Sequence, residues 1–135
     1  MQQILIVDDS PTIRRMVKAS LLALPPSLEF VEAGSGLEAI ERLALGDIGL
    51  MVLDLNMPDM HGLEVLTFIR GHHKYRHVPV IVLTTRGDDA SRTAALRAGA
   101  TAFMTKPFVP AALATCATDL LASRATASPT TPAAP

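Results

Sequence analysis

Short apolar runs alternate along the chain with segments in which apolar residues recur every three or four positions. The runs lie at residues 4–7, 28–31, 50–53, 80–83 and 102–104. Runs this short and this apolar are typical of buried strands, and the recurring spacing between them indicates amphipathic helices. Strands that alternate with helices favour a parallel sheet covered on both faces. We therefore expect an α/β fold with five strands and five helices.

Caps and apolar positions locate the helices. Ser10 is a suitable N-cap and Pro11 a suitable first residue for the first helix. The second helix is expected to bury an apolar stripe made of Leu37, Ile40, Leu43 and Ala44. In the fourth helix, predicted over residues 88–99, Leu96 is the single large apolar residue among alanines. We expect Leu96 to be the anchor of a weakly held helix, because burial of alanine stabilises little.

Length and composition limit the class of protein. A chain of 135 residues suits one folded domain, and a net charge of −1 provides no broad basic surface, so we expect no direct nucleic-acid binding. No apolar run approaches the ~18 residues of a membrane span and no signal peptide precedes the first strand, so we expect no membrane association. The single cysteine, Cys116, cannot form an internal disulfide, which favours a cytoplasmic protein.

The end of the chain differs in composition from the rest. From Arg124 onwards there are prolines, threonines and alanines but no large apolar residue. A segment of this kind buries too little apolar surface to fold by itself. We therefore expect a folded domain over residues 1–123 and a disordered tail or linker stub over residues 124–135.

Polar residues with reactive side chains stand at the ends of four of the five predicted strands. They are Asp8 and Asp9 after the first strand, Asp54 after the third, Thr84 and Thr85 after the fourth, and Thr105 and Lys106 after the fifth. The carboxyl ends of parallel strands share one edge of a sheet, where ligands bind, so these residues should meet. The sequence therefore predicts one site with three carboxylates, a hydroxyl and an ammonium group.

The predicted cluster of three carboxylates is self-repelling, and one lysine does not neutralise it. A divalent cation would, and an all-oxygen site that also keeps waters suits Mg²⁺. Beside a metal and Lys106, Asp54 is placed to attack a phosphoryl group. The metal and Lys106 would stabilise the equatorial oxygens, and Thr84 would donate a hydrogen bond to one of them. The pattern thus predicts Mg²⁺-dependent phosphoryl transfer to Asp54.

Four segments resemble the landmarks of a known family. They are Val-Asp-Asp-Ser at 7–10, Leu-Asp-Leu-Asn-Met-Pro at 53–58, Val-Leu-Thr at 82–84 and Thr-Lys-Pro-Phe at 105–108, and their spacing matches as well. Over residues 3–122 the chain resembles the receiver domains of two-component response regulators, most of all single-domain CheY-like receivers of the chemotaxis type. The resemblance implies a flavodoxin-like, doubly wound, five-stranded parallel sheet with strand order 2-1-3-4-5.

The resemblance also implies a role for each residue of the predicted site. Asp54 would be the phospho-acceptor. Asp9 and Asp54 would bind Mg²⁺ directly, together with the backbone carbonyl of Asn56, and Asp8 would act through a metal-bound water. Lys106 would pair with the phosphoryl oxygens.

Two further positions carry the switch in this family. Thr84 would be the switch hydroxyl, and Phe103 would be the aromatic residue that changes rotamer when that hydroxyl moves. Phe103 could also be an ordinary, partly buried strand residue, and this alternative stays open at this point. The peptide bond between Lys106 and Pro107 is cis in the family.

Three positions depart from the family pattern. His61 stands where receivers usually have Asp, in a turn that keeps Pro58 and Gly62, so we expect a normal turn with a changed surface. Thr85 replaces the usual Ala beside the phosphoryl group, and Arg86 takes a variable position that helps to set how fast phosphate is lost. These substitutions bear on the lifetime of the phosphorylated state rather than on its existence.

A receiver is a signalling domain that catalyses its own phosphorylation and dephosphorylation, not an enzyme with another substrate. The expected partners are a histidine kinase or phosphotransfer protein, and an output protein or second copy bound through the fourth helix, fifth strand and fifth helix. The fifth helix favours such contact, because Asp119 is its only charged residue between Pro110 and Ser123. Two alternatives stay open: the input half of a larger transcriptional or enzymatic regulator, and a pseudo-receiver that binds without phosphotransfer.

Other polar residues are interpreted as facing solvent. His72, His73 and His77 lie between the third helix and the fourth strand, at the edge opposite the carboxylates, and are interpreted as a solvated loop rather than a metal site. Arg14 and Arg15 are interpreted as outward-facing residues of the first helix, with Arg14 near the mouth of the site.

Overall fold

The computed structural model describes residues 2–22, 24 and 28–130. The strands are β1 (Gln3–Val7), β2 (Glu29–Ala33), β3 (Ile48–Leu53), β4 (Val80–Thr84) and β5 (Ala102–Thr105). The helices are α1 (Pro11–Ser20), α2 (Gly36–Leu45), α3 (Gly62–Gly71), α4 (Asp89–Ala98) and α5 (Pro110–Thr130). For the described part of the chain, the prediction of five strands alternating with five helices is confirmed.

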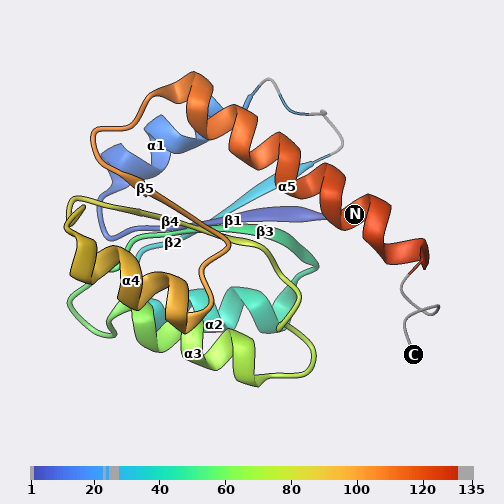
Figure 1. Ribbon diagram of the computed structural model, residues 1–135, viewed down its shortest axis with the longest axis horizontal. Coiled ribbons are helices and arrows are strands. Elements are labelled where there is room, and N and C mark those ends of the chain that lie inside the picture. The colour runs from blue at the N-terminus through green and yellow to red at the C-terminus, as the bar shows by residue number, and fades with distance from the viewer. Residues whose placement is uncertain (1, 23, 25–27, 131–135) are drawn as a thin grey trace.

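The strands form one parallel sheet in the order β2-β1-β3-β4-β5. Helices α1 and α5 cover one face of the sheet, and α2, α3 and α4 cover the other (Figure 1). Parallel strands need crossover connections, and α1, α2, α3 and α4 lie in the four connections between successive strands. This is the doubly wound, flavodoxin-like fold with strand order 2-1-3-4-5 that we expected.

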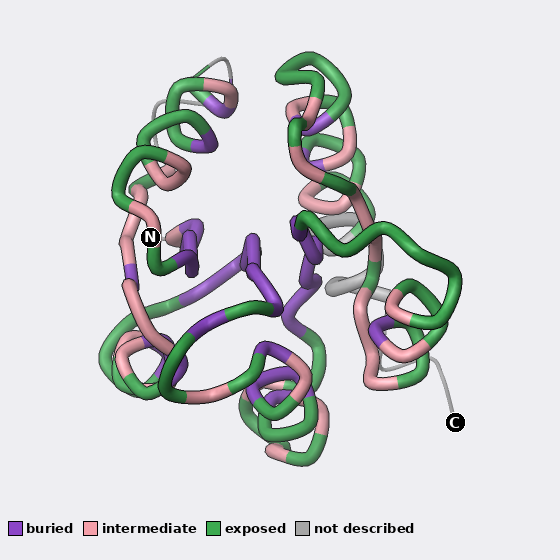
Figure 2. Tube along the Cα trace, turned by 90° about the vertical axis from the view of Figure 1, so that its left-hand side faces the viewer, coloured by how far each residue is buried: buried purple, intermediate pink, exposed green. Residues whose placement is uncertain are grey.

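The central strands β1, β3 and β4 form the most deeply buried layer of the molecule (Figure 2). Successive strand residues point to opposite faces of the sheet. Leu5 and Val7 therefore join the core beneath α2, α3 and α4, whereas Ile4 and Ile6 join the core beneath α1 and α5. Burial on both faces explains why these strands appear in the sequence as uninterrupted apolar runs.

The buried face of α2 differs from the predicted stripe. Leu37 is 60% exposed and Ala44 is exposed, whereas the buried residues of this helix are Gly36, Ala39 and Leu43. A Cβ at position 36 would lie 2.7 Å from the Cβ of Met60, so a glycine is needed for this turn to pack against the loop after β3. The close contact at Gly36 sets the rotation of α2 and turns Leu37 outwards.

The anchor predicted for α4 is wrong as well. Leu96 is 43% exposed, and the fully buried residue of this helix is its neighbour Ala95. The helix ends at Gly99, which has a left-handed φ of 112°, and a Cβ there would lie 2.5 Å from the Cγ of Arg70 on α3. Because α4 packs this closely, a small side chain fits beneath it where a leucine would not. Helix α4 thus buries less apolar surface than the sequence suggested.

Helix α5 continues to Thr130, past the boundary that we expected after Ser123. Alanines at positions 122, 125 and 127 favour this continuation, because alanine has the highest helix propensity. Residues 131–135 of the expected tail lie outside the described residues, and the assignment of 124–135 as a tail or linker stub stays a prediction. In the described part of the chain, no helix is both long and apolar enough to span a membrane. The expected cytoplasmic location stays a prediction.

Candidate functional site

The ends of four strands bring the predicted site residues to one edge of the sheet. Asp8 follows β1, Asp54 follows β3, Thr84 ends β4, and Lys106 follows β5. Backbone hydrogen bonds continue the sheet beyond the strands: the Asp54 amide donates to the Val7 carbonyl at 2.9 Å, and the Lys106 amide donates to the Thr84 carbonyl at 2.8 Å. The four side chains are therefore fixed relative to one another by the sheet itself.

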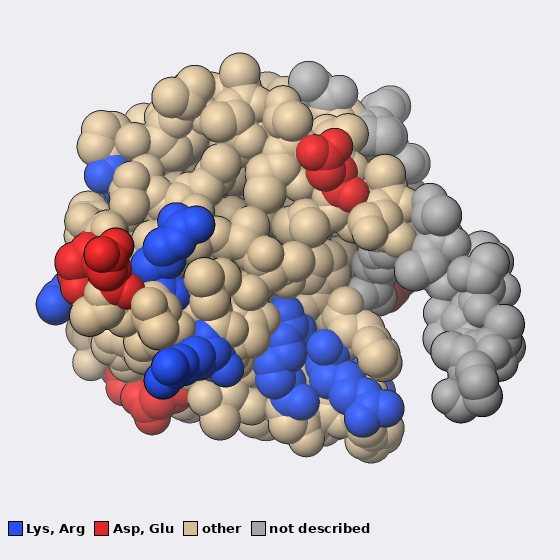
Figure 3. Space-filling view, viewed as in Figure 1, with Lys and Arg blue, Asp and Glu red and all other residues tan. Residues whose placement is uncertain are grey.

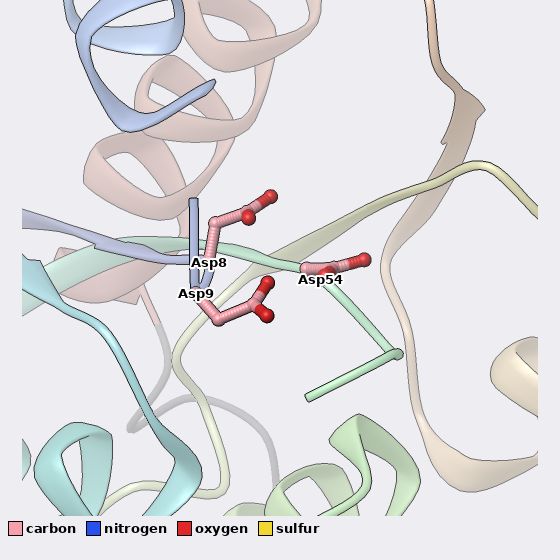
Figure 4. A group of neighbouring side chains, drawn as sticks. All are labelled: Asp8, Asp9 and Asp54. Carbon is pink, nitrogen blue, oxygen red and sulfur yellow. The ribbon is translucent and has the colours of Figure 1, made fainter. Parts of the chain in front are cut away.

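Three carboxylates share this edge. Asp8, Asp9 and Asp54 each offer one oxygen, and these oxygens all lie within 4.8 Å of one another. Figure 4 shows the three side chains leaving the ends of β1 and β3 and pointing to the same side. Asp8 and Asp54 are buried whereas Asp9 is exposed, so a bound ion would have protein oxygens on one side and water on the other. An all-oxygen donor set that leaves room for water fits Mg²⁺.

Lys106 bridges two of the carboxylates. Its Nζ lies 2.6 Å from Oδ2 of Asp8 and 3.5 Å from Oδ1 of Asp54, and its side chain is 11% exposed. Burial raises the pKa of Asp54 above its usual value; the positive charge of Lys106 opposes this shift, and the charge of Asp8 adds to it. One ammonium group thus leaves the cluster with excess negative charge, as predicted.

The Thr84 hydroxyl is fully buried and accepts two hydrogen bonds. Nδ2 of Asn56 donates to it at 3.3 Å, and the backbone amide of Arg86 donates at 3.4 Å. The resemblance assigned Asn56 only a backbone role, so its side-chain contact with Thr84 is an addition. The loop after β3 and the end of β4 are therefore joined through this hydroxyl.

The remaining predicted residues surround this centre. Phe103 is partly buried on β5, and the guanidinium of Arg92 lies 5.7 Å from the centre of its ring. Thr85 and Arg86 are exposed beyond the end of β4. The bond from Lys106 to Pro107 is cis, as the resemblance implied.

His61 takes over the capping of α3. Its Nδ1 accepts a hydrogen bond from the Leu63 amide at 3.2 Å, while the Glu64 carboxylate accepts one from the His61 amide at 3.1 Å. This reciprocal pair is a capping box, in which an imidazole replaces the usual hydroxyl. A Cβ at Gly62 would lie 2.6 Å from the backbone oxygen of Asp54, so the glycine lets the helix start beside the site. The turn keeps its geometry, as we expected.

Two residues near the site were missed by the sequence interpretation. Arg14 does not point outwards: its Nε donates to Oε1 of Glu32 at 2.8 Å, and its Nη1 donates to the backbone carbonyl of Asp8. Asp59 accepts hydrogen bonds at 3.1 Å from the first two backbone amides of α2, which lowers the pKa of this carboxyl. Glu32 and the α2 amides are distant in sequence from Arg14 and Asp59, and the Asp8 carbonyl is not at helical spacing from Arg14, so no local pattern indicated these contacts.

The histidines of the loop before β4 are separate from this site. The His72 ring stacks on Tyr75 with centroids 4.5 Å apart and on His73 at 5.2 Å. Within the described residues, Asp8, Asp9 and Asp54 make up the one cluster with metal-ligand geometry. The structure places these histidines after α3, in the connection to β4, and the expectation that they bind no metal stays a prediction.

Comparison with known proteins gives the same picture. Residues 4–118 match the family model of the response regulator receiver domain. The chemotaxis protein CheY1 of Helicobacter pylori is 38% identical over 112 residues, which cover 82% of this chain and 90% of that protein. The structure of the chemotaxis response regulator CheY4 of Vibrio cholerae has a TM-score of 0.79 at 31% identity, covering 89% of this chain and 98% of that one. Longer proteins match too: the cyclic di-GMP phosphodiesterase response regulator RpfG of Xanthomonas campestris is 36% identical over 90% of this chain, but the match spans 32% of that protein.

The fold, the cluster of acids at the strand ends and these matches agree. The chain belongs to the family of response regulator receiver domains, the signalling domains of two-component systems, and CheY-like single-domain receivers are among its relatives. Receivers bind Mg²⁺ at an acidic pocket, and the chemistry of the cluster here suits that ion.

Proposed function

We propose that Asp54 accepts a phosphoryl group from the phosphohistidine of a histidine kinase or phosphotransfer protein, and that this changes the surface formed by α4, β5 and α5. The observation that carries the proposal is the convergence of Asp54 with two further carboxylates and the Lys106 ammonium at one sheet edge. A site with excess negative charge and one fixed cation suits a reaction that brings in both a metal ion and a phosphoryl group.

The groups around Asp54 supply the chemistry. An Asp54 oxygen attacks phosphorus while the phosphorus–nitrogen bond of the phosphohistidine breaks, and the imidazole leaves with that electron pair and takes a proton from water. Asp9, Asp54 and the Asn56 carbonyl would hold Mg²⁺, with Asp8 acting through a water, and the bound ion would supply positive charge to the phosphoryl oxygens. Lys106 is already 3.5 Å from Asp54 and pairs with one of those oxygens.

Thr84 carries the signal away from Asp54 in this proposal. Its hydroxyl accepts hydrogen bonds in the unphosphorylated protein, and its own proton is available for a phosphoryl oxygen. Movement of Thr84 towards the phosphoryl group would weaken its hydrogen bonds with Asn56 and Arg86. Because Arg86 belongs to the loop that precedes α4, this loop would shift. Phe103, on the neighbouring strand, would follow in the space that Thr84 vacates.

Helix α4 is suited to move because it is weakly held. Its fully buried residue is an alanine, and an open surface pocket of about 270 Å³ is lined by its first turns, the loop after β3 and the start of α3. Elements that bury little apolar surface open or shift at low free-energy cost. Figure 3 shows that the face formed by α4, β5 and α5 is almost free of charge over α5. A partner protein or a second copy of the domain can approach the α5 part of this surface without desolvating charge, whereas the α4 part carries the exposed Asp89, Arg92 and Arg97.

A larger regulator is a second candidate, and one observation favours it: long proteins such as RpfG contain a matching segment that makes up only part of their length. In that case the same site would control an attached output domain rather than a separate partner. We disfavour a pseudo-receiver, because the sequence has Asp9, Asp54, Thr84 and Lys106, and Asp54 lies near both Asp9 and Lys106.

Labelling with a small phosphodonor tests the acceptor. With Mg²⁺ and acetyl phosphate the protein should gain about 80 Da, the mass of one phosphoryl group in the transfer reaction. Asp54→Asn should abolish the gain, and Asp9→Asn or a chelator should reduce it sharply, whereas Asp119→Asn on α5 should be labelled normally. Stable labelling of Asp54→Asn would refute the assignment, and an unlabelled wild type would favour the pseudo-receiver.

Hydrogen exchange with and without beryllofluoride, a phosphoryl mimic, tests the switch. Amides of α4, β5 and α5 should change protection in the wild type, and Thr84→Ala should be labelled by the phosphodonor yet lose this change. Thr67→Ala, an exposed threonine on α3, should behave as wild type. Protection changes confined to α1 and α2 would contradict the proposed route.

A further inference from the structure

Arg14 donates a hydrogen bond to the peptide unit that joins the two adjacent acids, Asp8 and Asp9. Its side chain is 16% exposed, and its guanidinium donates through Nη1 to the backbone carbonyl of Asp8 and through Nε to Glu32 at 2.8 Å. That carbonyl belongs to the peptide unit that links Asp8 to Asp9. Building on the proposed Mg²⁺-dependent function, we propose that Arg14 is a positioning residue that orients Asp9 for the metal, and that Glu32 holds Arg14 in place.

The two acids are restrained by different means. The Asp8 carboxylate is held by its own bonds, from Lys106 at 2.6 Å and from the Ser10 amide at 2.9 Å. No hydrogen bond or ion pair between described residues holds the exposed Asp9 carboxylate. The direction of the Asp9 side chain therefore depends on the peptide unit before it, which Arg14 fixes.

Glu32 prevents the guanidinium from neutralising the site. An arginine this close to a cluster of carboxylates would otherwise pair with one of them and compete with a metal ion. The bond to Glu32, near the end of β2, directs the guanidinium to the Asp8 carbonyl instead and makes the pair electrically neutral. A Cβ at position 34 would lie 3.2 Å from Nη1 of Arg14, so Gly34 leaves the space that this arrangement uses.

Charge and orientation have opposite effects on metal binding, which allows them to be separated. Removing Arg14 alone removes a positive charge, and this would strengthen Mg²⁺ binding if the role of Arg14 were electrostatic. The double variant Arg14→Met/Glu32→Gln removes the pair without changing the net charge. Any effect of the double variant on Mg²⁺ affinity therefore reports orientation. Arg15→Met, an exposed neighbour on the same helix, is the control for loss of an arginine.

The experiment is a Mg²⁺ titration of the full chain, followed by the NMR shifts of backbone amides around Asp9 and Asp54. The double variant should bind Mg²⁺ about tenfold more weakly than wild type, within the range for residues that orient metal ligands. Arg14→Lys, which keeps the charge but has no forked donor, should fall between them, and Arg15→Met should match wild type. With acetyl phosphate, the half-saturating Mg²⁺ concentration should rise tenfold while the rate at saturation stays within about twofold.

Circular dichroism melting shows whether each variant is folded. If the double variant is unfolded, the Mg²⁺ affinity of Arg14→Lys is compared with that of the wild type instead. Wild-type affinity in a folded double variant, or tighter binding, would overturn the positioning role. If the wild type itself fails to bind Mg²⁺ at Asp9 and Asp54, the proposed function is contradicted, and the role of Arg14 with it. The two failures are thus distinguished within one titration series.

Discussion

Replacing Asp54 by Asn should make the metal-free protein more stable, although it removes the group that the proposed reaction needs. At an effective dielectric constant of about 20, a carboxylate whose oxygen lies within 4.8 Å of Asp54 repels it by at least about 3.5 kcal/mol, and Asp8 and Asp9 both do so. The Lys106 ammonium at 3.5 Å attracts Asp54 by about 4.7 kcal/mol, so the repulsion exceeds the attraction. Burial of an ion that is 4% exposed adds to this unfavourable balance, since desolvation costs several kcal/mol. We expect a gain of about 2 kcal/mol.

Urea denaturation at pH 7.5 in a chelator measures this gain, which corresponds to about 8 °C in Tm at about 4 °C per kcal/mol for a domain of this size. Adding Mg²⁺ at ten times its Kd should stabilise the wild type by about 1.4 kcal/mol, and Asp54→Asn by less. Asp119→Asn, an exposed control, should stay within about 0.5 kcal/mol of wild type. A metal-free Asp54→Asn that is less stable than wild type would show that Asp54 is not held under electrostatic strain.

The pH dependence of the stability gain in Asp54→Asn follows from the raised pKa of Asp54. Burial raises the pKa of Asp54 above its usual value, so the folded state holds this proton more tightly than the unfolded state does. The protonated group contributes stability at low pH, and this stability is lost as the pH rises through the folded pKa. The advantage of Asp54→Asn should therefore be complete above that pKa and shrink as the pH falls towards the unfolded value. An advantage that grew on acidification would contradict this reasoning.

Two further predictions concern stability away from the acids. Arg70 donates to the carbonyls of Gly99 at 2.9 Å and Val78 at 2.6 Å, and Arg70→Met would leave these partly buried acceptors unpaired. Denaturant titrations should show a free energy of unfolding lower by about 2–3 kcal/mol, the range for loss of a charged donor. The exposed control Arg97→Met should change the free energy of unfolding little. Hydrogen bonds from the first two amides of α2 lower the pKa of Asp59. The contribution of Asp59 to stability is therefore present above the unfolded pKa and is lost as the pH falls through the folded pKa. Asp59→Asn should flatten the stability–pH curve in this acidic range, and an unchanged curve there would refute the capping role.

The convergence of the acids was predictable because it depends on topology. Once the apolar runs are assigned as parallel strands, every residue directly after a strand must lie at one edge of the sheet. The positions of Asp8, Asp54 and Lys106 needed no further information. The structure adds the distances, and with them the sharing of one lysine between two carboxylates.

Contacts that depend on how closely helices pack were not predictable. Leu96 is the larger residue and the better anchor by composition, yet the close approach of α3 and α4 leaves space only for Ala95. Arg14 looked like a surface residue because its partners, Glu32 and the Asp8 carbonyl, are not at helical spacing from it. Such contacts follow from the relative positions of elements, which local sequence patterns do not encode.

Chemical mapping of the phosphorylated residue tests the central claim most directly. An aspartyl phosphate is an acyl phosphate, and borohydride reduces it to homoserine, which marks the position permanently. After reaction with Mg²⁺ and acetyl phosphate, reduction and digestion, tandem mass spectrometry should find homoserine at position 54 and nowhere else. No homoserine should form in the presence of a chelator. Homoserine at position 8 or 9, or its absence from a protein that has gained a phosphoryl group, would contradict the account.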